Sequence, residues 1–429
     1  MRVRQMCAAK ARNMLAMNTA ALPLNPVPLR QDAQVIGLVG LAHATSHFAH
    51  LLLAPLFPVF IKEFGLTFSD VGLLVTLFFV VSGAGQALAG FVVDRIGARP
   101  VLFAAMGIFA VAAMCAATAT GYNGLVLAAL LAGLGNAPFH PADFTILNQR
   151  VSEPRLGYAF SAHGLTGNLG WAVAPLFLVG IASVSHWRVA YWCAAALYLV
   201  VLALLWFNRD RLLTSTAKSR AADKSYVAST EHPLAYLKLP VVWWCFGFFM
   251  LSTMTLAVIQ SFAPSILQKL HGVSFEAASL TLSAYMLSGA LGMFVGGWVA
   301  AKKATYSDRV VAYAMAAGAA LLLLCATSVL GATGTMVGLA ATGFAVGIGG
   351  PSRDMMIRKA TPKSATGRVY GTVYSGLDVG FALSPLVFGA LMDAGHYQAT
   401  LAGAAAVLLA SVGLALGVGR LTRQAAAVV

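Results

Sequence analysis

The sequence has very little charge for its length. Acidic and basic residues together make up 10% of the 429 positions, against roughly 25% in an average soluble protein. A water-soluble chain needs charged side chains over its surface, so this composition excludes an ordinary soluble domain. Hydrophobic residues make up 59% of the chain. We therefore expect lipid to surround most of the molecule.

Motifs for covalent or metal-thiolate chemistry are also missing. The sequence contains no HExxH pattern, no GxSxG elbow and no phosphate-binding P-loop. The five cysteines are scattered, without the paired spacing of a disulfide framework or a zinc-thiolate site. We therefore expect a protein that is not an enzyme and needs no cofactor.

Long runs without a charged residue alternate with short polar segments. Examples are the runs 33–61, 71–93 and 156–187, each long enough for one helix across the hydrocarbon core, which takes about 20 residues. Two longer runs break at turn-like clusters, 121–124 and 331–334. The pattern predicts an all-α integral membrane protein with twelve transmembrane helices.

The most polar internal stretch divides these spans into six and six. We expect a cytoplasmic N-terminal arm over 1–32, with Met14 and Met17 as alternative initiators, and a first six-helix bundle over 33–208. A cytoplasmic linker over 209–240 would lead to a second bundle over 241–420 and a cytoplasmic tail over 421–429.

Basic residues predict the orientation. Nearly all of the 28 Lys and Arg residues fall in segments that lie on one side of the membrane if both termini are cytoplasmic. The exceptions are Lys62, Arg188, Lys269 and Arg353. The net charge of +14 is therefore a matter of topology, spread over short loops, and predicts no nucleic-acid binding. We expect a multi-pass monomer in the cell (inner) membrane.

The two halves resemble each other at a spacing of 210 residues. This offset aligns glycines and prolines of the fourth and fifth spans with those of the tenth and eleventh. The aligned pairs are Gly133 with Gly343, Pro141 with Pro351, Gly157 with Gly367, Gly170 with Gly380, and Pro175 with Pro385. Two pseudo-symmetric six-helix bundles with a binding site between them near the midplane are a transporter architecture.

The loop after the second span carries a specific motif. It has Gly90, Asp94, Arg95, Gly97 and Arg99 at the spacing GxxxDRxGxR, which resembles the signature of the major facilitator superfamily. The resemblance implies the major facilitator fold, in which the acidic residue caps a neighbouring helix end and the basic residues hold the inward gate shut. The corresponding loop of the second half has Lys302 and Lys303 but no acid.

Two further segments are similar to the fosmidomycin-resistance branch of that superfamily. They are 133–141, which contains Phe139-His140-Pro141, and 163–171, which contains Gly167-Asn168-Leu169-Gly170. This resemblance implies a proton-driven exporter of small, often anionic, compounds.

Ionisable residues inside a span are costly, and each is a functional candidate. Asp143 and Arg353 are mates under the 210-residue offset, so we predict a breakable ion pair between them across the central cavity. Arg353 could instead hold a substrate carboxylate or phosphonate in bidentate fashion, and a permanent structural bridge is the third alternative. Asp354 points elsewhere, with a cytoplasmic-side or packing role.

Histidines are concentrated in the first five spans. His43, His47 and His50 share one face of the first span, His140 precedes Asp143 by one turn, and His163 lies in the fifth span. Imidazole titrates near neutral pH, which suits a proton relay. The alternatives are buried structural hydrogen-bond donors and a metal site, since histidines at i and i+4 can share a metal ion.

Asn168 and Asp378 are another pair of repeat mates. One half thus has a neutral amide where the other has an acid, which fits either a second protonation or binding position or a hydrogen-bonded helix contact. Together these features predict a secondary transporter that exports a small organic compound or drug, with anions among the candidate substrates, in exchange for protons. The alternatives are an uptake carrier or exchanger for an organic anion and a carrier of a metal or metal chelate.

Overall fold

The structure is a computed structural model that describes residues 28–215, 235–303, 306–360 and 366–428. Residues 1–27 of the predicted arm and 216–234 of the predicted linker lie outside these ranges. Within them the secondary structure is helical, without strands, and twelve segments are long and apolar enough to cross a membrane. The prediction of an all-α protein with twelve spans is therefore confirmed.

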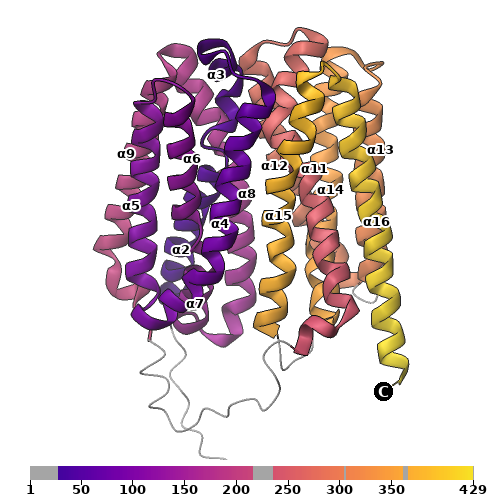
Figure 1. Ribbon diagram of the computed structural model, residues 1–429. Coiled ribbons are helices and arrows are strands. Elements are labelled where there is room, and N and C mark those ends of the chain that lie inside the picture. The colour runs from indigo at the N-terminus through magenta and orange to yellow at the C-terminus, as the bar shows by residue number, and fades with distance from the viewer. Residues whose placement is uncertain (1–27, 216–234, 304–305, 361–365, 429) are drawn as a thin grey trace, which may run out of the picture.

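The first six spans form one bundle and the last six form another, and Figure 1 shows the two side by side. The helices of the N-terminal bundle are α2 (Leu29–His50), α3 (Phe57–Phe64), α4 (Phe68–Ile96), α5 (Ala98–Ala117), α6 (Tyr122–Asn136), α7 (Phe139–Arg150), α8 (Leu156–Val184) and α9 (Trp187–Phe207). Those of the C-terminal bundle are α11 (Pro240–His271), α12 (Phe275–Lys302), α13 (Ser307–Ala326), α14 (Gly331–Ala360), α15 (Thr366–Asp393) and α16 (Tyr397–Val428).

Short 3-10 turns join or follow some of these helices: η1 (Ala54–Leu56), η2 (Glu153–Arg155), η3 (Arg209–Leu212) and η4 (Ala235–Lys238). Two of the twelve spans are broken helices. The first consists of α2, η1 and α3, and the fourth consists of α6 and α7, which are separated at Ala137 and Pro138. Proline lacks a backbone donor and interrupts the helical hydrogen-bond ladder.

The repeat seen in the sequence recurs in the packing. Gly170 on α8 lies so close to α2 that a Cβ would overlap the carbonyl oxygen of Ala44, and its mate Gly380 on α15 lies equally close to the carbonyl oxygen of Met250 on α11. Small residues permit such close helix contacts in membranes. The fifth span thus packs on the first as the eleventh packs on the seventh.

The two bundles meet mainly where α15 packs on α4 and α12 packs on α8. Near the start of α4, two backbone N–H groups of the N-terminal bundle donate to Asp393 at the end of α15: Phe68 N to Oδ1 at 2.6 Å and Ser69 N to Oδ2 at 2.9 Å. The Ser69 hydroxyl donates to the same carboxylate. A carboxylate of one bundle therefore caps a helix of the other, which closes this end of the molecule, the upper end in Figure 1.

Asp393→Asn is expected to favour separation of the bundles at this end. Loss of a charged helix cap costs about 1 kcal/mol, which shifts a two-state equilibrium about fivefold. The measurement is the distance distribution between spin labels at positions 62 and 396 in a cysteine-free background.

Asp70→Asn is the matched control, because Asp70 caps the same terminus of α4 through Thr67 of its own bundle. It should leave the distances unchanged. A long-distance population that is equal in the two variants would show that the Asp393 contact does not hold this end closed.

Candidate functional site

Five of the predicted site residues of the N-terminal bundle come together in one cluster, in which His43, Asp143 and His163 are buried. His43 and His47 lie on α2, His140 and Asp143 on α7, and His163 on α8. The ring centroids of His43 lie 3.4 Å from His163, 4.4 Å from His47 and 5.5 Å from His140. We call these five residues the histidine cluster. The first helix of the bundle and the consecutive helices α7 and α8 therefore contribute to a single site.

Asp143 lies at the centre of the histidine cluster and is fully buried (0% exposed). Its Oδ2 is 3.1 Å from Nε2 of His163 and 3.2 Å from Nδ1 of His43. Asp143 has no arginine or lysine partner in the described part of the chain. Imidazole nitrogens thus take the place of the usual basic side chain beside this carboxylate.

The predicted breakable ion pair between Asp143 and Arg353 is not formed in this conformation. Asp143 contacts histidines of its own bundle, while Nε of Arg353 donates to Asp354 at 3.0 Å. The reason lies in the fourth span, which is broken at Pro138, whereas the tenth span is the single helix α14. Residues that match under the repeat therefore do not share an orientation.

His50 belongs to a different network, whose hydrogen bonds satisfy both ring nitrogens. Its Nε2 lies 3.1 Å from Oδ1 of Asn136, and Nδ1 accepts from Nε1 of Trp171 at 3.3 Å. Asn136 also accepts from the Ser46 hydroxyl at 2.6 Å and donates to the Ser82 hydroxyl at 2.8 Å. This network joins α2, α4, α6 and α8, and we interpret it as structural.

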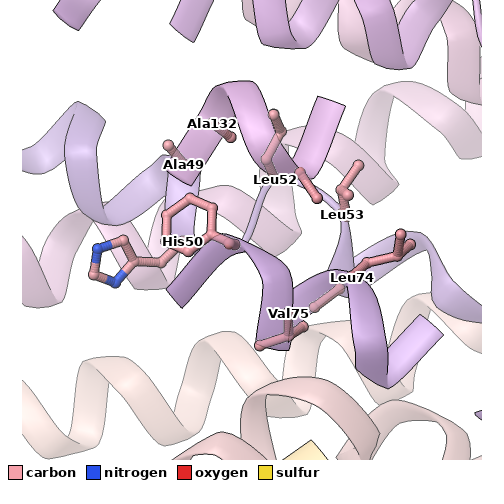
Figure 2. A pocket seen from close by; sticks show the side chains of 10 residues that line it. Ala49, His50, Leu52, Leu53, Leu74, Val75 and Ala132 are labelled. Carbon is pink, nitrogen blue, oxygen red and sulfur yellow. The ribbon is translucent and has the colours of Figure 1, made fainter. Parts of the chain in front are cut away.

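A small cavity of about 10 Å³ lies beside His50, with room for about one water molecule. Figure 2 shows that the labelled residues around it are apolar apart from His50, among them Leu52, Leu53 and Leu74. The nitrogens of His50 are already hydrogen-bonded. This cavity therefore offers neither the volume nor the polar groups that a substrate needs.

In the C-terminal bundle, Arg353 forms a second polar group with residues of three helices. Its guanidinium lies 4.9 Å from the ring centroid of Phe249 on α11, and Asp354 also accepts from the Tyr374 hydroxyl of α15 at 3.4 Å. The side chains of Arg353 and Asp354 are 30% and 46% exposed. Unlike Asp143, these two charges remain accessible.

Asp378 and Asn168 lie where the bundles touch. The Cβ of Asp378 on α15 faces Gly83 on α4, and a Cβ added at Gly83 would lie only 3.1 Å from it. Asn168 on α8 donates to the sulfur of Met293 on α12 at 3.2 Å. The repeat mates are therefore both at the interface, and Asp378 is half-buried, without a hydrogen-bond partner among the described residues.

The predicted gating motif, Gly90–Arg99, covers the end of α4 and the start of α5, at the opposite end of the molecule from Asp393. Gly97 has φ +90°, a conformation that favours glycine. Asp94 is exposed, and Nη1 of Arg99 donates to a carbonyl oxygen of η3 at 3.3 Å. In this conformation Arg99 thus binds its own bundle. The gating role of the motif remains a prediction.

Sequence reasoning missed several partners of these residues. Tyr374 precedes Asp378 by one helical turn, so an i, i+4 search around each intramembrane acid would have found it. Asn136 lies within the 133–141 segment, but the sequence alone suggests no role for it. Nothing in the sequence marks Gln86 as a partner of His140, although its Oε1 lies 3.0 Å from Nδ1 of that residue.

Comparison with known families decides the assignment. The model of the Major Facilitator Superfamily matches residues 39–334, more than half of the chain. The chain belongs to the major facilitator superfamily. The solved structures agree on the fold: a bacterial homologue of the human lysosomal transporter Spinster, in an inward-facing and occupied conformation, has a TM-score of 0.69 at 15% identity over 92% of this chain and 96% of that one. The nucleoside transporter NupG has a TM-score of 0.67 at 16% identity, over 92% and 99%.

Among curated relatives, this superfamily member resembles the fosmidomycin resistance protein of Escherichia coli strain K12, with 27% identity over 64% of this chain and 66% of the relative. The probable L-galactonate transporter of the same organism is 23% identical over 56% and 54%. The probable sulfoacetate transporter SauU of Cupriavidus necator is 23% identical over 84% and 87%. The first two alignments leave a third or more of each relative unmatched. The expected resemblance to the fosmidomycin-resistance branch is confirmed.

Asn136→Ala is expected to lower the free energy of unfolding by about 1–3 kcal/mol, because it leaves the polar groups of Ser46, Ser82 and His50 without a partner inside the bundle. The measurement is unfolding in detergent micelles. Asn148→Ala is the matched control, since Asn148 is exposed and bonds only to its own helix. Equal effects of the two substitutions would contradict a structural role for this network.

Proposed function

We propose that this superfamily member is a secondary active transporter that exports a small organic anion in exchange for protons. The observation that supports this best is the group of Arg353, Asp354 and Tyr374, which lies one turn of α15 away from Asp378 at the bundle interface. Arg353, a cation that can hold an anion, thus lies on α14, and Asp378, an acid that can bind a proton, lies on α15.

Arg353 is the proposed anion site. A guanidinium fits a carboxylate, sulfonate or phosphonate in bidentate fashion, and this one is partly exposed and held by Asp354 through a single hydrogen bond. An arriving anion would take the place of Asp354 as its partner. The relatives named for L-galactonate and sulfoacetate, both anions, favour this class of substrate.

Asp378 is the proposed proton site. Coupling in an alternating-access carrier requires a group whose surroundings change when the bundles move. Asp378 faces Gly83 across the interface, so movement of the bundles would change its environment. Tyr374 links it to the anion site, because one face of α15 carries both side chains and Tyr374 donates to the partner of Arg353.

We infer the direction of transport from resemblance. With both termini cytoplasmic, as the basic residues predict, the end at which Asp393 joins the two bundles is the outer one. The relative named for fosmidomycin resistance favours export. An uptake carrier for an organic anion would use the same Arg353 site, and accumulation in cells with and without the protein separates the two directions. We place the transporter in the bacterial inner membrane as a monomer.

Asp378→Asn is expected to abolish proton movement driven by anion gradients, because an amide cannot carry the proton. Arg353→Lys keeps the charge but loses the bidentate geometry, so the anion concentration for half-maximal flux should rise about tenfold. The measurement is proton flux in proteoliposomes given sugar acids, sulfoacetate, nitrate and phosphonates.

Asp308→Asn, the same substitution elsewhere in the C-terminal bundle, where Asp308 pairs with Arg423, is the matched control and should retain flux. Flux that survives Asp378→Asn but disappears in Asp143→Asn would return the coupling acid to the N-terminal bundle. Transport of an anion without any proton movement would contradict proton coupling itself.

A further inference from the structure

The side chains of the histidine cluster take part in neither the proposed anion site nor the proposed proton site. We infer that His43, Asp143 and His163 form a binding site for a divalent transition-metal ion of the zinc class inside the N-terminal bundle. This inference goes beyond the proposed transport function and is independent of it, because it concerns only the described residues of α2, α7 and α8.

The geometry fits one ion. The ligand atoms of His43, Asp143 and His163 all lie within 4.8 Å of one another, and those of the two histidines are 3.2 and 3.1 Å from Asp143 Oδ2. Ligand atoms about 2.0–2.2 Å from a tetrahedral zinc ion lie about 3.4 Å apart. A small adjustment of the rings would therefore bring the three atoms onto one ion.

Hydrogen bonding within the protein does not account for the cluster. Nε2 of His163 can donate to Asp143. Nδ1 of His43 lies 3.2 Å from Asp143 Oδ2 but does not form a hydrogen bond with it, and Nδ1 of His47 and Oδ1 of Asp143 are also buried without a hydrogen-bond partner. Each unpaired buried polar atom costs about 1–3 kcal/mol. Coordination to a metal ion would satisfy atoms that the protein itself leaves unsatisfied.

A hydrogen bond of His140 also leaves one of its ring nitrogens free to bind a metal ion. His140 has Gln86 Oε1 3.0 Å from its Nδ1, so a proton on Nδ1 leaves Nε2 with a free lone pair, as outer hydrogen bonds do for metal-binding histidines. The ligand atoms of His43, His47 and His140 also lie within 4.8 Å of one another. His47 and His140 therefore lie next to His43, beside the proposed site.

Space for these rings depends on Gly167 of α8. A Cβ at this position would lie 2.7 Å from Cε1 of His47 and 3.1 Å from Nε2 of His43, tighter than a packed core allows. The absence of a side chain at Gly167 therefore leaves room for the ring of His43, a proposed ligand, and for the ring of His47 beside it.

The donor set selects the class of ion. Imidazole and carboxylate donors without thiolate suit Zn²⁺, Co²⁺ and Ni²⁺, whereas Mg²⁺ and Ca²⁺ prefer oxygen donors alone. A divalent ion would also balance the carboxylate of Asp143, which has no lysine or arginine partner within the described residues.

The ion would be resident rather than transported. His43, Asp143 and His163 are 2%, 0% and 6% exposed, and all three belong to helices of one bundle. Movement of the bundles against each other does not open a site enclosed in this way. The ion would cross-link α2, α7 and α8 next to the segment Phe139-His140-Pro141.

The test is Zn²⁺ binding to the full chain, purified in detergent with a tag that contains no histidine, treated with chelator and then titrated with Zn²⁺. We expect one ion per chain and an absorption spectrum with nitrogen and oxygen neighbours at about 2.0–2.1 Å, including imidazole. Asp143→Asn and His43→Gln should weaken binding at least tenfold. His50→Gln, which replaces a partly buried imidazole of the same helix outside the site, should bind as the wild type does.

Wild-type protein without bound Zn²⁺, or Zn²⁺ bound equally well by Asp143→Asn, would overturn the inference. The spectrum of the wild type decides the matter if the variants fail to fold, because a shell without imidazole would contradict the site. Neither measurement involves transport, so failure of the metal site and failure of the proposed function are distinguishable.

Discussion

Lipid cannot solvate a carboxylate, so each acidic side chain within a span must obtain its partners from the protein. This constraint explains the most specific features of the structure. Asp143 lies among imidazoles, Asp354 accepts from Arg353 and Tyr374, and Asp393 binds backbone N–H groups of α4. Asp378 lacks such a partner within the described residues, and it lies at the interface that an alternating-access carrier must open.

The same constraint is met differently in the two bundles, which gives them different roles. In the N-terminal bundle, the polar groups are enclosed and belong to helices that move together, which suits a fixed site. In the C-terminal bundle, Arg353 and Asp354 are accessible, and Tyr374 connects them to the helix that meets the other bundle. The proposed transport reaction therefore takes place on one half, while the other provides the opposing surface.

Much of the fold could be predicted from the sequence, because the membrane imposes a simple rule on composition. Charge-free runs predict the spans, and the offset of 210 residues predicts equivalent packing, as Gly170 and Gly380 confirm. The site could be predicted in composition but not in pairing. The repeat places Asp143 opposite Arg353 only if both spans are equally straight, and the break at Pro138 turns Asp143 toward His43 and His163. Contacts such as Gln86 with His140 depend on helix rotation, which periodicity does not reveal.

The central claim is that the surroundings of Asp378 change during transport while those of Asp143 do not. Cysteines at position 375, one turn of α15 before Asp378, and at position 143, each in a cysteine-free background with metal chelated, can be reacted with a membrane-impermeant thiol reagent from either side of oriented vesicles. We expect the thiol at 375 to react from one side at rest and to become less accessible there when substrate and a proton gradient are applied, whereas the thiol at 143 stays unreactive throughout. Reactivity at 143 that varies with substrate, with none at 375, would contradict this claim.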